Sequence, residues 1–191
     1  MEQFKLFLEL GLTHVLDING YDHVLFLMVL AAPYLFSNWK KILLLVTVFT
    51  VGHTLSLILA AFEVVSVKSS LVEFLIPVTI GVAAVYNIIT AGKNQTNDKV
   101  GVLFFTTLFF GVIHGLGFSN YFRMIIGRSE EKIVPLLEFA LGIEIAQVLI
   151  VVAMLILATL FQTFLRVTRK DWVLVVSSIV IGLIIPMLLE R

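Results

Sequence analysis

Four histidines and the acidic residues near them are the side chains of this sequence that could do chemistry. His14 and His23 stand with Asp17 and Asp22 in the ten-residue stretch HVLDINGYDH, and the other two histidines lie in the apolar stretches FTVGHTLSL and FGVIHGLGF. Imidazole, carboxylate and amide groups together suit nickel, cobalt or zinc. The chain has no cysteine, which excludes disulfides and thiolate metal sites. These residue types indicate a metal site or a proton relay.

The composition is typical of an integral membrane protein. Of the 191 residues, 60% are hydrophobic and 14% are charged, and the mean hydropathy is +1.08. No separate hydrophilic stretch is present, so we expect a single membrane domain over residues 1–191 in a lipid bilayer. The formal net charge is zero, which gives no clustered basic face and excludes nucleic acid as a partner.

The apolar runs predict an all-α, polytopic transmembrane helical bundle with about six spanning helices. The expected spans are residues 22–36, 42–62, 71–91, 100–118, 134–165 and 172–189. Before them, FKLFLELGLTHVL is too short to span and carries Lys5 and Glu9, which predicts an interfacial or re-entrant helix. The first twenty residues lack a basic start and a cleavage site, so we expect no cleaved signal peptide.

The alternating direction of six spans assigns each polar residue to one half of the bilayer, whichever way the protein faces. All four histidines and most intramembrane acids are predicted to share one half, with His114 about a turn from the end of its helix. The residues on this side are His14, Asp17, Asp22, His23, His53, Glu73, His114, Glu138, Glu144 and Gln147. Ionisable groups at this depth cost several kcal/mol unless they pair or bind something. This convergence predicts a buried polar site.

The individual residues have alternative interpretations. Glu144 and Gln147 are three apart, so they share one helix face and could meet the histidines. Asp22 could cap the first spanning helix as well as bind a metal ion. Glu73 and Glu138 open helices, where a carboxylate favours the helix dipole, and we interpret them as supporting groups. Small residues near these positions permit close helix approach; they are Gly52, Gly111, Gly115, Gly117 and Gly142.

Three functions fit such a site. A transport site needs ligands that are individually weak and exposed to each side in turn. A zinc-dependent intramembrane hydrolase would use three histidines and a water, with Glu144 or Asp22 as general base. The third interpretation is a hydrogen-bonded scaffold. The other half of the bundle offers only Asn87 and a few hydroxyls for onward movement of an ion, which modestly favours a one-sided site.

Four motifs resemble the HupE/UreJ family of small membrane proteins linked to hydrogenase and urease maturation. They are GLTHVLDINGYDHVLFLMVL, FTVGHTLSLILAA, FFGVIHGLGF and LEFALGIEIAQV, which lie between Gly11 and Val148. The resemblance implies a small helical bundle and the passage of nickel or cobalt toward metalloenzymes and their maturation proteins. It assigns metal contacts to His14, Asp22, His23, His53, His114 and Glu144, with Asp17 ranked lower. The chain departs from the family pattern at Ala140 and Ala146, where asparagine and glycine are usual.

The remaining expectations concern the surroundings of the protein. The two sides of the predicted bundle carry seven and six Lys and Arg residues, and this small difference places the amino terminus outside. We expect a bacterial inner membrane as the location and a homo-oligomer as the assembly. The sixteen phenylalanines are expected to face lipid or to pack between helices.

Overall fold

The computed structural model describes residues 2–18, 20–92, 100–126 and 131–189, and this part of the chain is helical without strands. The all-α bundle predicted from the sequence is therefore confirmed. The helices are α1 (Glu2–Leu16), α2 (Asp22–Ala31), the short 3-10 helix η1 (Phe36–Asn38), α3 (Trp39–Ala61), α4 (Ser69–Thr90), α5 (Val100–Ile126), α6 (Ile133–Phe164) and α7 (Arg169–Leu189).

Five helices, α3 to α7, are long and apolar enough to cross a membrane by length and composition. The expected first span, residues 22–36, is shorter than predicted. It forms α2, a helix of ten residues, which is about 15 Å long against the roughly 30 Å of a hydrocarbon core. Pro33 follows two residues after the end of α2, and proline has no N–H with which to continue a helix.

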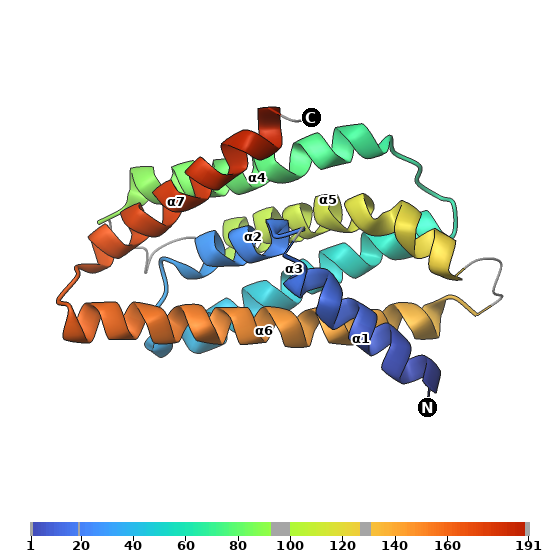
Figure 1. Ribbon diagram of the computed structural model, residues 1–191, viewed down its shortest axis with the longest axis horizontal. Coiled ribbons are helices and arrows are strands. Elements are labelled where there is room, and N and C mark those ends of the chain that lie inside the picture. Colours follow the sequence, from blue (N-terminus) through green and yellow to red (C-terminus); the bar gives the residue numbers. More distant parts are fainter. Residues whose placement is uncertain (1, 19, 93–99, 127–130, 190–191) are drawn as a thin grey trace.

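The short helix α2 lies inside the bundle. It packs against α4, α6 and α7, and its side chains are buried or half-buried on every face. In Figure 1, α1 crosses α6 obliquely, and α2 continues along the long axis of the bundle from the point where α1 ends. Together, α1 and α2 resemble one discontinuous helix whose break lies near the middle of the molecule.

Two close backbone contacts hold the elements that carry the histidines. Gly11 of α1 lies directly on Gly142 of α6, because a Cβ atom added at Gly142 would come within 3.0 Å of the Gly11 Cα. Gly52 of α3 lies in the same way on Gly111 of α5, at 3.3 Å. Glycine permits helix axes to approach this closely. The predicted role of Gly52, Gly111 and Gly142 in close packing is thus confirmed.

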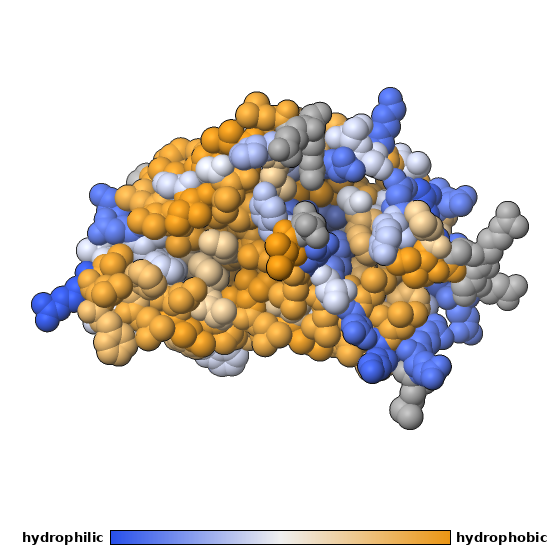
Figure 2. All heavy atoms as spheres, in the orientation of Figure 1, coloured by the Kyte–Doolittle hydropathy of each residue, from blue (hydrophilic) through white to orange (hydrophobic). Residues whose placement is uncertain are grey.

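The surface is divided along the long axis of the molecule. Figure 2 shows hydrophilic side chains at both ends and a broad hydrophobic surface between them, as expected for a protein surrounded by lipid. Hydrophilic atoms also appear in the middle of this surface. Below it, buried apolar side chains from all seven α-helices form one connected cluster.

Candidate metal site

His14, His23 and His53 form a compact cluster at the break between α1 and α2. Each offers a ring nitrogen, and these three atoms lie within 4.8 Å of one another. The ring centroids are 4.7 Å apart for His14 and His23, and 5.6 Å apart for His23 and His53. His114 stands next to this group, with its ring 5.3 Å from that of His23. The four histidines that the sequence assigned to one side therefore meet in one place.

Hydrogen bonds orient two of these rings. Nδ1 of His23 lies 3.1 Å from Oδ1 of Asp22 and donates to it, and Nδ1 of His114 lies 2.9 Å from the Phe110 carbonyl oxygen and donates to it. In each ring the proton is then on Nδ1, and Nε2 keeps its lone pair. Partners of this kind fix the tautomer and orientation of metal-binding histidines.

Five buried ring nitrogens in the cluster have no hydrogen-bond partner among the described residues. They are Nε2 of His14, His23 and His114, and both ring nitrogens of His53. An unsatisfied buried polar atom costs about 1–3 kcal/mol, so several at one point indicate a place for a bound group. A neutral imidazole binds a metal ion through a ring nitrogen that keeps its lone pair, and each of these rings offers such a buried nitrogen.

The spacing fits a metal ion with modest adjustment. Nitrogens bound about 2.1 Å from a tetrahedral ion are about 3.4 Å apart, whereas the three in this cluster lie within 4.8 Å of one another. An ion would draw the rings inward by small rotations, or bind fewer of them and retain water. Three or four neutral imidazoles suit nickel, cobalt and zinc.

The family model described as HupE / UreJ protein matches residues 1–190. The chain belongs to the HupE/UreJ family. Comparison with curated proteins and with solved structures gives no match. The family resemblance found in the four motifs is thereby confirmed over essentially the whole chain, and it agrees with the apolar helices in describing an integral membrane protein.

His114 of this HupE/UreJ protein lies further from the end of its helix than the sequence indicated. The fourth span was expected to end at residue 118, about a turn beyond His114, but α5 continues to Ile126. His114 is therefore twelve residues, or about 18 Å, from the end of its helix. The extension was missed because Ser119, Asn120 and Arg123 gave this part of the sequence the character of a loop.

Glu144 of the HupE/UreJ protein contacts hydroxyl groups of α3. Thr47 Oγ1 donates to one carboxylate oxygen at 2.6 Å, and Thr50 Oγ1 donates to the other. Thr50 also contacts the amide oxygen of Gln147 at 3.3 Å, so Glu144 and Gln147 do share one face as predicted. We call Thr47, Thr50, Glu144 and Gln147 the oxygen cluster. The sequence reasoning missed Thr50, although it lies one turn before His53 on the same helix.

The other acidic residues of the predicted set occupy different positions. Asp22 accepts hydrogen bonds from Nδ1 and from the backbone amide of His23, so its carboxylate does satisfy a first-turn amide of α2 as predicted, although the N-cap position itself is Tyr21. Asp17 lies beside His14 on the wall of a surface hollow of about 830 Å³. Glu138 is half-buried near the start of α6, and Glu73 is exposed near the start of α4.

The hollow beside His14 gives the cluster a way to the outside. Its wall includes Leu12 and Thr13 of α1, Asp17 after that helix, and Phe118 of α5. The hydrophilic atoms in the middle of the hydrophobic surface in Figure 2 lie where the chain passes from α1 to α2. Of the four histidines, His14 is the one that lines this hollow.

Proposed function

We propose that this HupE/UreJ protein binds a divalent transition-metal ion at His14, His23, His53 and His114, and carries it across the membrane. The observation that supports this most directly is the set of five buried ring nitrogens at one point that have no hydrogen-bond partner in the described part of the chain. Nickel or cobalt is the expected cargo, as the family resemblance implies. Delivery to metalloenzyme maturation proteins, a homo-oligomeric assembly, a bacterial inner membrane and an amino terminus outside belong to the same proposal.

Imidazole nitrogens are suitable ligands for nickel and cobalt, and a transport site built from them releases the ion by opening to each side of the membrane in turn. Conduction requires a site that replaces the water around an ion and still releases it. The carboxylate of Asp22 is hydrogen-bonded to Nδ1 of His23. It therefore places a negative charge behind a proposed ligand ring and does not bind the ion itself. This arrangement strengthens binding without fixing the ion permanently.

A zinc-dependent hydrolase fits the contacts less well. Its general base must reach a metal-bound water directly or through one further water. Asp22 is engaged with the ring and the amide of His23, and Glu144 is engaged with two threonine hydroxyls of α3. A hydrogen-bonded scaffold is also disfavoured, because it would pair the ring nitrogens that have no partner among the described residues.

The test combines equilibrium metal binding with uptake. Purified chain in mild detergent is dialysed without chelator, its metal content is measured by plasma mass spectrometry, and Ni²⁺ and Co²⁺ are titrated back. We expect weak, exchangeable binding of about one ion per chain and Co²⁺ uptake into proteoliposomes, with both abolished in His53→Ala. Gln162→Ala, at a half-buried polar residue near the far end of α6, serves as the control.

The outcomes separate the hypotheses. Tightly held zinc that vanishes in His53→Ala, without uptake of any ion, would favour the hydrolase. Equal binding and uptake in the wild type and in His53→Ala would refute a histidine site altogether.

A further inference from the structure

A second hollow lies on the other side of the histidines. It is a cavity of about 460 Å³ between α2, α4 and α5, and it is partly open to the surface of the bundle, where its wall residues Val82, Tyr86 and Val102 are exposed. Its wall includes Asn87 near the end of α4, and Thr106 and Thr107 of α5. Asn87 and the hydroxyls are the few polar groups that the sequence offers in this half of the bundle. The fold gathers them around one space.

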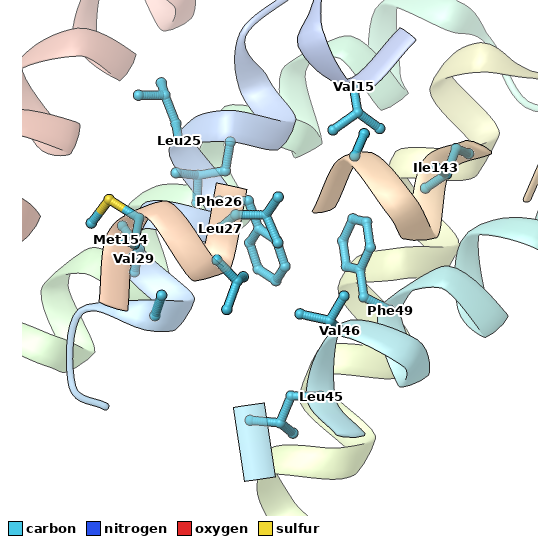
Figure 3. Packing of buried hydrophobic residues seen from close by; sticks show 14 of the residues in the cluster. Val15, Leu25, Phe26, Leu27, Val29, Leu45, Val46, Phe49, Ile143 and Met154 are labelled. Carbon is cyan, nitrogen blue, oxygen red and sulfur yellow. The ribbon is translucent and has the colours of Figure 1, made fainter. Parts of the chain in front are cut away.

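Phe26 of α2 lies between this cavity and the histidines. Its ring contributes to the cavity wall, and the ring centroid is 5.5 Å from that of His114. It also stacks on Phe49 of α3 at 4.7 Å. Figure 3 shows Phe26 and Phe49 together in the buried core. Phe49 in turn lies 5.1 Å from His114, so these two rings form the layer between the metal site and the cavity.

Phe110 of α5 joins the same layer and links it to the metal site. Its side chain lines the cavity, and its ring is 5.8 Å from that of Phe26. Its carbonyl oxygen accepts the hydrogen bond from Nδ1 of His114. One residue therefore contacts a proposed ligand through its backbone and the cavity through its side chain.

We propose that the cavity receives the hydrated divalent cation after it leaves the histidines, and that Phe26 is the barrier it must pass. The proposal rests on the proposed transport function. A layer of apolar rings excludes water and so blocks an ion when closed. The cavity is large enough to receive the Phe26 ring when it rotates away, since about 150 Å³ holds a benzene molecule.

The cavity wall suits release more than capture. Amide and hydroxyl groups such as those of Asn87 and Thr107 are weaker ligands for nickel or cobalt than imidazole. Arg169, whose guanidinium donates to the Pro33 carbonyl at this end of the bundle, adds positive charge near the cavity wall. A cation that passes Phe26 therefore finds few groups that retain it.

The first experiment compares uptake with binding. Initial Co²⁺ uptake into proteoliposomes is measured for the wild type, Phe26→Ala, Phe26→Leu and Phe105→Ala, a matched control on the exposed face of α5. The energy of stacking between Phe26 and Phe49 sets the expected change in the barrier to ion movement. We therefore expect about a tenfold rise in the uptake rate for Phe26→Ala and a smaller rise for Phe26→Leu. Equilibrium Co²⁺ affinity and the Phe105→Ala rate should match the wild type. Unchanged uptake in folded Phe26→Leu and Phe26→Ala would overturn the proposal.

The second experiment probes the cavity without relying on uptake. The chain has no cysteine, so a single Thr107→Cys substitution reports on the cavity wall. A membrane-impermeant methanethiosulfonate reagent is applied to each side of the proteoliposome in turn. We expect modification from one side when Phe26 is present, and from both sides when Thr107→Cys is combined with Phe26→Ala.

The two arms separate failure of this proposal from failure of the proposed function. Modification from neither side in folded protein would show that water does not reach the cavity, as when a lipid chain fills it, and would overturn the proposal. The same one-sided pattern with and without Phe26 would also overturn it. Absence of Co²⁺ binding or uptake in the wild type would refute the transport function, while the labelling pattern still decides whether Phe26 is the barrier.

Discussion

Replacing Asp22 by asparagine tests whether this carboxylate acts on a metal ion directly or through His23. Oδ1 of Asp22 lies 3.1 Å from Nδ1 of His23 and 2.9 Å from the backbone nitrogen of the same residue. In this geometry the carboxylate orients the ring and raises the basicity of Nε2, the proposed ligand atom. Asparagine keeps an oxygen acceptor at this position and removes the charge.

The magnitude follows from the strength of the bond that is changed. A hydrogen bond to a carboxylate is roughly twice as strong as one to a neutral acceptor, and loss of an outer partner of a ligating histidine lowers metal affinity about 10-fold to 100-fold. We expect Asp22→Asn to weaken Ni²⁺ or Co²⁺ binding about tenfold, or about 1.4 kcal/mol. Asp22→Ala removes the acceptor as well, so we expect about a hundredfold loss.

The assay is an equilibrium titration of purified chain in detergent, followed by the visible absorption of bound Co²⁺. Asp171→Asn is the control, because that carboxylate accepts from Thr168 Oγ1 at 2.6 Å near the start of α7, outside the metal site. If Asp22→Asn lowered the Co²⁺ affinity as much as His23→Ala does, the reasoning would be refuted, because Asp22 would then be a ligand itself. An unchanged Co²⁺ affinity in Asp22→Asn would also refute it, because the carboxylate would then have no effect on the ion through His23.

Three further substitutions test how the helices are held, each by thermal unfolding in detergent. Gly142→Val forces α1 away from α6 and should destabilise the protein by about 1–3 kcal/mol, whereas Gly182→Val, which has no neighbouring atoms within 4 Å, should lower the melting temperature far less. Thr50→Val removes a donor to Glu144 and should cost roughly 1–3 kcal/mol while Co²⁺ still binds. Asn87→Leu breaks the 2.8 Å bond to an α2 carbonyl and should cost about 1 kcal/mol; unchanged melting would contradict that bond.

The sequence predicted the meeting of the histidines because helix direction alone decides which half of a bilayer a residue occupies. His53 and His114 lie on neighbouring parallel helices, α3 and α5, and their depths can be counted from either end. The Nδ1 partner of His114 was not predictable, because it is the carbonyl of Phe110, a backbone group that carries no side-chain signal. The backbone contact of Gly11 with Gly142 was missed because α1 was interpreted as lying at the interface.

The rotation of a helix about its own axis was the harder property to predict. The sequence grouped Glu144 with the histidines from depth and spacing, and the structure joins it by hydrogen bonds to Thr47 and Thr50. Helix α6 is apolar around its whole circumference, so its sequence shows no hydrophobic stripe from which to read orientation. Helix α2 is likewise apolar on all sides, so its sequence shows no stripe that would distinguish Phe26 from the phenylalanines that face lipid.

The shortness of α2 also has a consequence for how the protein is made. A ten-residue helix cannot be held in a bilayer by its own hydrophobicity, and its backbone ends need neighbours that cover them. Those neighbours, α4, α6 and α7, are synthesised later than α2. A nascent chain therefore holds His14 and His23 long before it can place them beside His114. The order of synthesis thus delays the meeting of the four histidines until α5 has been inserted.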